Sequence, residues 1–209
     1  MNSIYSGYRE EAYVSLREYY EPGYRERNNR LAQSITYKGD IEEFLSTFVK
    51  DPLTILDWGG DTGANTPFEK RRVSLDIFDI SGKVVEGDAR AVTREQATSS
   101  KYRLVICSQI LEHIPFPLDV LLPVRETMDS ESILYIEVPY EELMRTEIIE
   151  KEKKKRHWHE HVNFYSQSSM DALLENCGFD VLKRNILVTE VAGNQVHILQ
   201  VACRLSWRL

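Results

Sequence analysis

Histidines and a glutamate lie close together between His157 and His161, in the sequence His-Trp-His-Glu-His. An imidazole titrates near neutral pH, so a residue of this type can accept a proton during catalysis. The histidines also alternate along the chain, and on a strand they would share one face and could bind a metal. No cysteine or carboxylate cluster elsewhere in the sequence clearly completes such a site, and we predict no metal. A purely structural role for the histidines is the remaining alternative.

A glycine-rich turn follows a short apolar run at residues 55–56. The run is typical of a buried parallel strand, and the carboxylate of Asp57 stands at its end. In open α/β sheets, ligands bind at the carboxyl ends of the strands. Glycine permits positive φ angles and lets a ligand approach the main chain. The sequence therefore predicts a ligand-binding loop that contains Gly59, Gly60 and Gly63.

Two further acidic residues follow this turn. Asp76 stands at the end of one strand candidate, and Asp88 stands at the end of the next. A carboxylate in such a position can accept hydrogen bonds from the hydroxyl or amino groups of a nucleotide. Alternatively, Asp76 is a solvated strand end and Asp88 is a turn residue.

The glycine-rich turn and the two acidic strand ends resemble the nucleotide-binding half of class I S-adenosylmethionine (SAM)-dependent methyltransferases. The resemblance implies SAM as cofactor and S-adenosylhomocysteine as product. It also implies that Asp57 and the loop hold the methionine end, that Asp76 accepts the ribose hydroxyls, and that Asp88 meets the adenine. Asp61 stands where the family has the middle of three alternating glycines. The implied cofactor-binding residues are Asp57, Gly59, Gly60, Gly63, Asp76, Ile77, Asp88, Ala89, Ser108 and Gln109.

The segment from Tyr102 to Ile114 resembles the fourth motif of the same family, a buried strand that ends in polar residues and then Leu-Glu-His. The last residues of this strand would lie under the methionine part of SAM. Glu112 and His113 would face the site of methyl transfer. Helix capping or surface hydrogen bonding is the alternative role for this pair.

The histidine-rich segment resembles a signature of sugar methyltransferases, in which a His-Glu-His run precedes aromatic residues and a serine. The last histidine of that run serves as the base and corresponds to His161, while Trp158 replaces the family's tyrosine. The basic run Lys153–Arg156 is either a solvated loop or a site for the phosphate of a nucleotide sugar. The implied catalytic residues are His161, Glu160 and His113, and the implied substrate-binding residues are Glu112, Tyr140, His159, Lys155 and Arg156.

The predicted function is methyl transfer from SAM to a small polar acceptor, namely a saccharide or nucleotide sugar, with O-methylation favoured over C-methylation. A catalytically silent SAM-binding partner subunit is one alternative, and it would have no use for a base at His161. A methyltransferase for a non-sugar metabolite, such as a quinone or polyketide, is another alternative. That function would require an apolar acceptor cavity.

Strand candidates alternate with helix candidates from Leu53 onward, which favours a three-layer α/β sandwich around a mostly parallel, Rossmann-like seven-stranded sheet. The last two strands would form a hairpin around Gly193-Asn194 and give one antiparallel edge strand. Asp40 is a candidate N-cap for the first helix and Ser166 for the last. We expect strands at Thr54–Asp57, Arg72–Asp76, Lys83–Gly87, Leu104–Ser108, Ile133–Val138, Val181–Leu187 and His197–Cys203, and helices at Ile41–Val49, Pro117–Met128, Tyr140–Glu152 and Gln167–Cys177. Residues 1–50 are expected to form a helical cap or lid, and residues 51–209 the methyltransferase domain.

Composition limits the classes of partner. The chain has 209 residues and a net charge of -7, and such an acidic balance argues against nucleic-acid binding, which requires a basic surface. No apolar run is long enough to span a bilayer, and we expect no signal peptide. Cys107, Cys177 and Cys203 are predicted to be buried free thiols, which fits a reducing cytoplasm. The sequence leaves the oligomeric state open.

Overall fold

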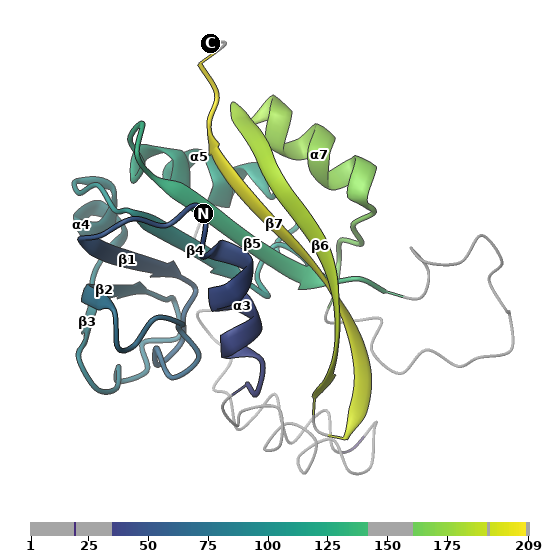
Figure 1. Cartoon of the computed structure of the whole chain (residues 1–209), viewed down its shortest axis with the longest axis horizontal. Coiled ribbons are helices and arrows are strands. Elements are labelled where there is room, and N and C mark those ends of the chain that lie inside the picture. The colour runs from purple at the N-terminus through teal and green to yellow at the C-terminus, as the bar shows by residue number, and fades with distance from the viewer. Residues whose placement is uncertain (1–18, 20–34, 142–160, 192, 208–209) are drawn as a thin grey trace, which may run out of the picture.

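The computed structural model describes residues 19, 35–141, 161–191 and 193–207. Its strands are β1 (Leu53–Trp58), β2 (Arg72–Phe78), β3 (Ala89–Ala91), β4 (Leu104–Ser108), β5 (Ile133–Pro139), β6 (Phe179–Val191) and β7 (Asn194–Leu205). They form one sheet in the order β3-β2-β1-β4-β5-β7-β6 (Figure 1). β3, β2, β1, β4 and β5 are parallel to one another, and β7 runs antiparallel to both of its neighbours. The expected seven-stranded, mostly parallel sheet is confirmed.

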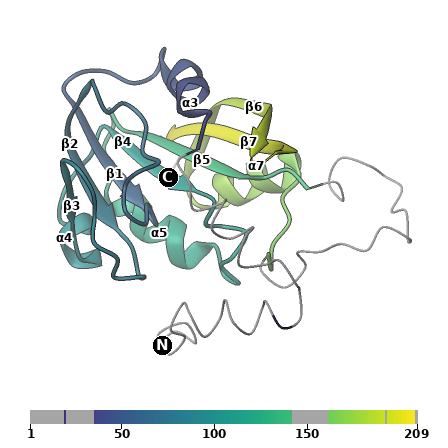
Figure 2. The same ribbon diagram turned by 90° about the horizontal axis from the view of Figure 1, so that it is seen from below.

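Helices cover both faces of the sheet (Figure 2). Helix α3 (Lys38–Leu45) packs on one face, where its Ile41 and Phe44 join a cluster with Ile106 and Tyr135. The opposite face carries α4 (Arg94–Thr98), α5 (Leu118–Glu126) and α7 (Gln167–Asn176). Because a fully buried leucine or isoleucine contributes about 1.5–3 kcal/mol, these two apolar layers hold the sheet between the helices. The three-layer sandwich therefore follows from helices with one apolar face each.

Two helices begin at side-chain caps that the sequence encodes. The Ser166 hydroxyl accepts the backbone N–H of Ser169 at the start of α7, and Gly178 follows the helix with φ 80°. Both features match the predicted ends of that helix. Helix α4 was not expected, although Thr93 and Gln96 form a reciprocal capping box at its start. The spacing of this threonine and glutamine is the signal that could have revealed α4.

The third strand lies later in the chain than expected. Residues 83–87 form no strand, and Val84 is exposed. The backbone N–H of Glu86 donates to the carbonyl of Thr62 in the glycine-rich loop, and Gly87 turns the chain with φ 64°. The strand pairing with β2 is made instead by residues 89–91, opposite residues 75–77. The prediction of a strand at Lys83–Gly87 is wrong because the backbone of this segment bonds to the glycine-rich loop and not to β2.

The first described helix begins earlier than expected. Helix α3 has Tyr37 at its N-cap position without a side-chain capping bond, and Asp40 lies within its first turn. The prediction of Asp40 as the N-cap is therefore wrong. Tyr37 instead donates its hydroxyl to Glu137 in the sheet at 3.0 Å. A tertiary contact, rather than a local cap, fixes the start of this helix.

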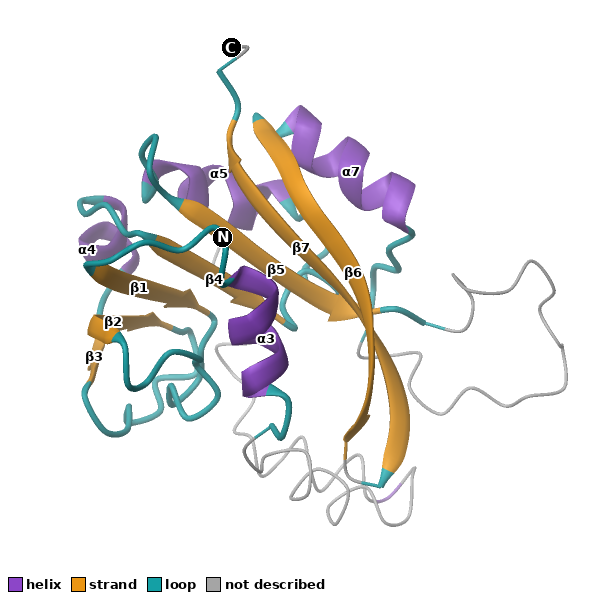
Figure 3. Cartoon of the chain, viewed as in Figure 1, coloured by secondary structure: helices purple, strands orange, loops and turns teal. Residues whose placement is uncertain are grey.

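The terminal hairpin turns where expected, between Val191 and Asn194. However, its antiparallel strand β7 lies between β5 and β6, and the edge strand is β6. The antiparallel strand is therefore internal and not at the edge as predicted. Residues 194–197 of β7 pair only with β6, so the ribbon extends beyond β5 (Figure 3).

Several predicted segments lie outside the described residues. These are residues 1–34 of the expected helical cap apart from Tyr19, most of the helix expected at Tyr140–Glu152, and the basic run Lys153–Arg156. The division at residue 50 stays a prediction. Within the described ranges, no helix has the length and apolar character that a membrane span requires.

Candidate active site

The glycine-rich loop follows β1 and depends on its glycines. A side chain at Gly59 would place its Cβ 2.5 Å from Cδ1 of Ile110, and one at Gly60 would place it 2.6 Å from Cγ of Asp57. Gly59 and Gly63 also have φ 83° and 85°. Asp61 takes φ 52°, a left-handed conformation that aspartate tolerates better than most residues. The loop therefore keeps its tight course although aspartate replaces the middle glycine of the family pattern.

Asp57 lies at the inner wall of this loop. Its side chain is buried and accepts a 2.6 Å hydrogen bond from the Thr66 hydroxyl. Burial raises the pKa of Asp57 to about 7, the bond from Thr66 opposes the rise, and nearby Glu137 and Asp79 add to it. A positively charged ligand at this position would favour the ionised carboxylate.

Asp76 faces away from the loop. It lies inside β2 opposite Leu56, on the face covered by α4 and α5. Its carboxylate accepts two bonds from Arg90, at 2.9 and 2.6 Å, and one of 2.7 Å from the Tyr102 hydroxyl. Burial and this bond raise the pKa of Tyr102 to about 12. The acceptor capacity of Asp76 is thus used by neighbouring side chains of the protein.

A different carboxylate stands at the carboxyl end of β2. Asp79 follows the strand directly, and its Oδ2 accepts the backbone N–H of Asp61 at 2.9 Å. Sequence reasoning missed this residue because the strand was expected to end at Asp76. The turn at Ser81-Gly82 is the signal that could have placed the strand end correctly.

Asp88 lies at the amino-terminal ends of the strands, opposite the ends that carry the loop. It precedes β3, and its carboxylate accepts hydrogen bonds from Arg72, the first residue of β2. The prediction that Asp88 stands at a strand's carboxyl end is therefore wrong. Ala89 and Ile77 lie beside Gly63, each with a carbon 3.3–3.4 Å from where a Cβ of that glycine would stand. They pack against the loop at Gly63 and do not line the cavity.

Ser108 and Gln109 end β4 and surround a buried carboxylate. Glu137, which is fully buried, accepts hydrogen bonds from the hydroxyls of Ser108 at 2.5 Å, Tyr37 at 3.0 Å and Tyr135 at 2.7 Å. The backbone N–H of Gln109 donates to the Glu137 carbonyl, and Gln109 has φ 54°. A glutamine held in this conformation is uncommon and marks a constrained position.

Two segments that are distant in the sequence meet beyond β4. The Glu112 carbonyl accepts the backbone N–H groups of Val162 and Asn163, at 2.7 and 3.1 Å. The Asn163 side chain donates to the Ile114 carbonyl at 2.6 Å, and the Tyr165 hydroxyl donates to the Leu111 carbonyl at 3.0 Å. These bonds place His161 beside residues 112–113 in a fixed arrangement.

His161 has a carboxylate partner and a histidine neighbour. Its Nδ1 lies 2.9 Å from Oε1 of Glu141, and its ring centroid lies 5.0 Å from that of His113. Glu112 is 2% exposed, and its Oε1 lies 3.8 Å from Nε2 of His113. Burial raises the pKa of the Glu112 carboxyl to about 7, and the nearby His161 opposes the rise. The cluster thus joins imidazole and carboxylate groups that can accept or hold a proton.

One cavity of about 710 Å³ connects the glycine-rich loop with this cluster. Of the predicted site residues, Asp57, Gly59, Gly60, Ser108, Gln109, Glu112, His113, Tyr140 and His161 line it. Gly63, Asp76, Ile77, Asp88 and Ala89 do not line it, while Lys155, Arg156, His159 and Glu160 lie outside the described residues. The structure adds Tyr37, Tyr135, Glu141 and His197 to the lining.

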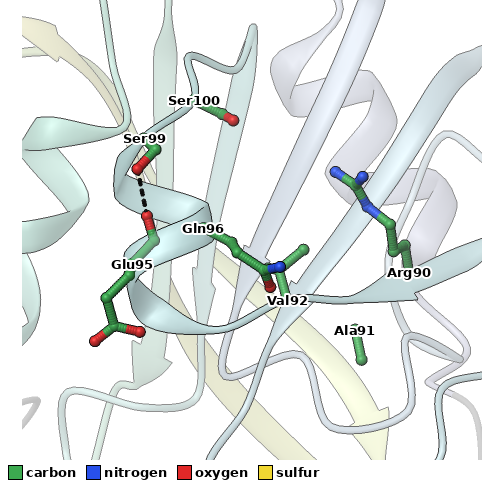
Figure 4. A pocket seen from close by; sticks show the side chains of 7 residues that line it. All are labelled: Arg90, Ala91, Val92, Glu95, Gln96, Ser99 and Ser100. Atoms are coloured by element: carbon green, nitrogen blue, oxygen red, sulfur yellow. Dashed lines mark hydrogen bonds between the residues drawn. The ribbon is translucent and has the colours of Figure 1, made fainter.

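A second pocket, of about 420 Å³, lies between β3 and α4 and is lined by residues 90–92, 95–96 and 99–100 (Figure 4). The Ser99 hydroxyl donates to the Glu95 carbonyl at 2.6 Å along its wall. Its Arg90 is the partner of Asp76. No residue of the glycine-rich loop lines this pocket, which again separates Asp76 from the loop cavity.

Comparison with known proteins assigns the fold to a family. A family model described as a methyltransferase domain matches residues 24–184. No curated protein matches the chain in sequence. Because the family model spans more than half of the chain, the chain belongs to the methyltransferase-domain family. The predicted relationship to class I SAM-dependent methyltransferases is confirmed.

Solved structures share this fold at low sequence identity. A SAM-dependent methyltransferase from Methanosarcina mazei is 17% identical with a TM-score of 0.57, over 78% of this chain and 97% of that chain. The glycopeptide N-methyltransferase MtfA in complex with SAM is 13% identical with a TM-score of 0.61, over 83% and 97%. Magnesium protoporphyrin IX methyltransferase from Synechocystis PCC 6803 is 16% identical with a TM-score of 0.57, over 92% and 99%. The last two of these enzymes are named for different acceptors, a glycopeptide and magnesium protoporphyrin IX.

Proposed function

We propose that this chain transfers the methyl group of SAM to a small polar acceptor, with His161 as the proton acceptor. The observation that carries the proposal is the single cavity lined by both the glycine-rich loop and the His161–Glu141 pair. A methyl donor at the loop and an acceptor at the histidine would then share one cavity. Alignment of two reactants in one site is a large part of catalysis for such a displacement.

The glycine-rich loop would hold the cofactor. Asp57, which lines the cavity, would face the positively charged methionine end. Asp79, whose carboxylate is bonded to the loop backbone at Asp61, would accept the ribose hydroxyls. Asp79 replaces Asp76 in this role because the carboxylate of Asp76 is bound to Arg90 and lies on the other face of the sheet. Ser108 and Gln109, fixed by Glu137, would form the floor under the methionine part.

The histidine would supply the base. SAM provides an electrophilic methyl group on a sulfonium, and the acceptor hydroxyl must lose its proton as it attacks. With Nδ1 of His161 facing Glu141, the ring would take this proton on Nε2. The carboxylate of Glu141 then stabilises the imidazolium and fixes the ring orientation, as the aspartate does for the histidine of a Ser-His-Asp triad. Deprotonation by a positioned base contributes roughly 10²–10⁴ in rate.

The acceptor is proposed to be a saccharide or nucleotide sugar that is methylated on oxygen. The acidic and imidazole groups at the far end of the cavity can hold sugar hydroxyls. No lysine or arginine of the described part of the chain lines this cavity. Recognition of a phosphate would therefore fall to Lys153–Arg156. Three buried free cysteines fit action in the reducing cytoplasm.

A second candidate is a methyltransferase for a largely apolar metabolite. The cavity lining also includes Ile35, Ile41, Val191, Val196 and Ile198, together with Tyr135. Such a wall can cover an aromatic or aliphatic acceptor body. The same His161 would then deprotonate a phenol or enol.

An acceptor screen with labelled SAM tests these proposals. A panel of sugars, nucleotide sugars, phenols and quinols is incubated with the purified chain, and transfer of label is measured. Transfer to a sugar hydroxyl supports the first candidate, and transfer to an apolar phenol supports the second. If SAM binds but His161→Ala retains full transfer to the accepted substrate, the assignment of the base is wrong.

A further inference from the structure

Three potential metal ligands converge at the end of the cavity. Ligand atoms of Glu112, His113 and His161 all lie within 4.8 Å of one another. They come from the turn after β4 and from the segment before α7. The sequence did not indicate this set, because it predicted only alternating histidines as a metal alternative and two of those lie outside the described residues. Folding, not sequence spacing, brings these three groups together.

The buried carboxylate of Glu112 points to a ligand. The residue is 2% exposed, and neither side-chain oxygen has a hydrogen-bond partner in the described part of the chain. A buried polar group without a hydrogen-bond partner destabilises the folded chain, and a charged group does so more strongly. Nε2 of His113, 3.8 Å away, is too distant for a hydrogen bond. A cation between the carboxylate and the imidazoles would give Glu112 the partner that it lacks.

Glu141 completes the arrangement around His161. Metal-bound histidines almost always direct their other ring nitrogen at a carboxylate or carbonyl, which fixes the tautomer and ring orientation. Nδ1 of His161 lies 2.9 Å from Oε1 of Glu141. A metal would therefore bind His161 through Nε2, with Glu141 as the orienting group.

The backbone around the cluster is already fixed. Val162 and Asn163 both donate to the Glu112 carbonyl, and the Asn163 side chain spans to the Ile114 carbonyl. The ligands of a tetrahedral zinc site lie about 3.3–3.5 Å apart at metal–ligand distances near 2.0–2.1 Å. Side-chain rotation of His113, which is 42% exposed, can bring its nitrogen closer without moving this backbone.

We propose that Glu112, His113 and His161 bind a divalent transition-metal ion of the Zn²⁺ class. Two imidazoles and one carboxylate suit Zn²⁺, whereas Mg²⁺ prefers an all-oxygen shell. A bound ion takes up Nε2 of His161, the nitrogen that receives the proton in the proposed reaction. This consequence rests on the proposed function: the metal-loaded chain is then an inhibited form, and SAM binding at the loop is unaffected.

Zinc titration of the purified full chain, after chelator treatment, tests the site directly. Calorimetry is expected to show one Zn²⁺ per chain and no comparable heat with Mg²⁺. His113→Ala and Glu112→Gln should each weaken zinc binding at least tenfold, and Glu141→Gln should weaken it roughly 10–100-fold. His197→Ala is the matched control, since His197 lines the same cavity outside the cluster, and it should bind zinc as the wild type does.

Unchanged zinc affinity in both His113→Ala and Glu112→Gln would overturn the proposal, because the ion would then bind elsewhere. The absence of any zinc binding by the wild-type chain would also overturn it. Thermal unfolding and SAM binding of each variant show whether it is folded. A loss of zinc binding supports the site only where the variant is folded. Failure of the proposed function would appear separately, as zinc binding without SAM binding or without methyl transfer.

Discussion

The imidazole of His161 faces the carboxylate of Glu141, with Nδ1 and Oε1 2.9 Å apart. The pair lines the same cavity as the glycine-rich loop after β1. Because of this arrangement, we propose His161 as the proton acceptor and Glu141 as the group that orients it.

Replacement of His161 by alanine should lower kcat by at least about a hundredfold, because a positioned base contributes roughly 10²–10⁴ in rate. SAM affinity should stay within about twofold, since the base contacts the acceptor. Steady-state kinetics with an identified acceptor, together with SAM calorimetry, measure both effects. His113→Ala is the matched control. If it is inactive while His161→Ala is active, the base is His113.

Glu141→Gln tests the positioning role of the carboxylate. The amide keeps the size of the side chain but cannot stabilise an imidazolium as a carboxylate does. We expect kcat to fall at least about tenfold with KM for SAM unchanged. A comparable fall in SAM affinity would mean that Glu141 acts on the cofactor or on folding instead.

Asp79→Asn and Asp76→Asn form a matched pair that tests which carboxylate meets the ribose. Charge-assisted hydrogen bonds contribute about 1.5–3 kcal/mol each, so loss of Asp79 should weaken SAM binding at least tenfold. Asp76→Asn should leave SAM affinity nearly unchanged but lower the free energy of unfolding. That loss comes from the weakened bonds to Arg90 and Tyr102. The reverse pattern of SAM affinities would restore Asp76 as the cofactor residue.

The pKa of Asp57, raised by burial to about 7, predicts two pH effects. The ionised carboxylate should bind the positive methionine end better, so SAM affinity should rise as the pH increases through about 7. Thr66 and Arg72 favour this ionisation, while Glu137 and Asp79 oppose it. Calorimetry from pH 6 to 8 would show the rise, and Asp57→Asn should abolish it. An equally steep pH dependence in Asp57→Asn would exclude this carboxyl as the cause.

Stability should follow the opposite trend with pH. Because the folded pKa of Asp57 lies above its unfolded value, the folded chain binds the extra proton between about pH 4 and pH 7. The contribution is present at the acidic end of this window and is lost as the pH rises through about 7. It amounts to at most about 4 kcal/mol for a shift of three units. As the pH rises across this window, the unfolding free energy of the wild type should therefore fall relative to that of Asp57→Asn.

The sequence predicts the sheet and the loop well because these features have local signals. Apolar runs mark β1, β4 and β5, and glycines mark the turn where side chains would collide with Asp57 and Ile110. Asp79 and Glu141 could not be assigned in the same way. Their roles depend on where β2 ends and on which side chains meet after folding. Asp76 and Asp79 both follow apolar residues, and only the strand register shows which one reaches the loop.

Long-range contacts also explain the errors at β3 and α3. Val84 and Val85 have the composition of a strand, yet Thr62 in the loop takes the backbone bond of Glu86. Tyr37 starts α3 through its bond to Glu137 across the core. In each case the local sequence favours one conformation, but a contact with a distant residue stabilises a different one.

The most direct test of the central claim is a calorimetric titration of the metal-free chain with S-adenosylhomocysteine. The account predicts one binding site per chain, and it predicts that Gly60→Val abolishes binding, because a side chain there collides with Asp57. His161→Ala should bind the ligand as the wild type does. The absence of detectable binding to the folded wild-type chain at millimolar ligand would contradict the account.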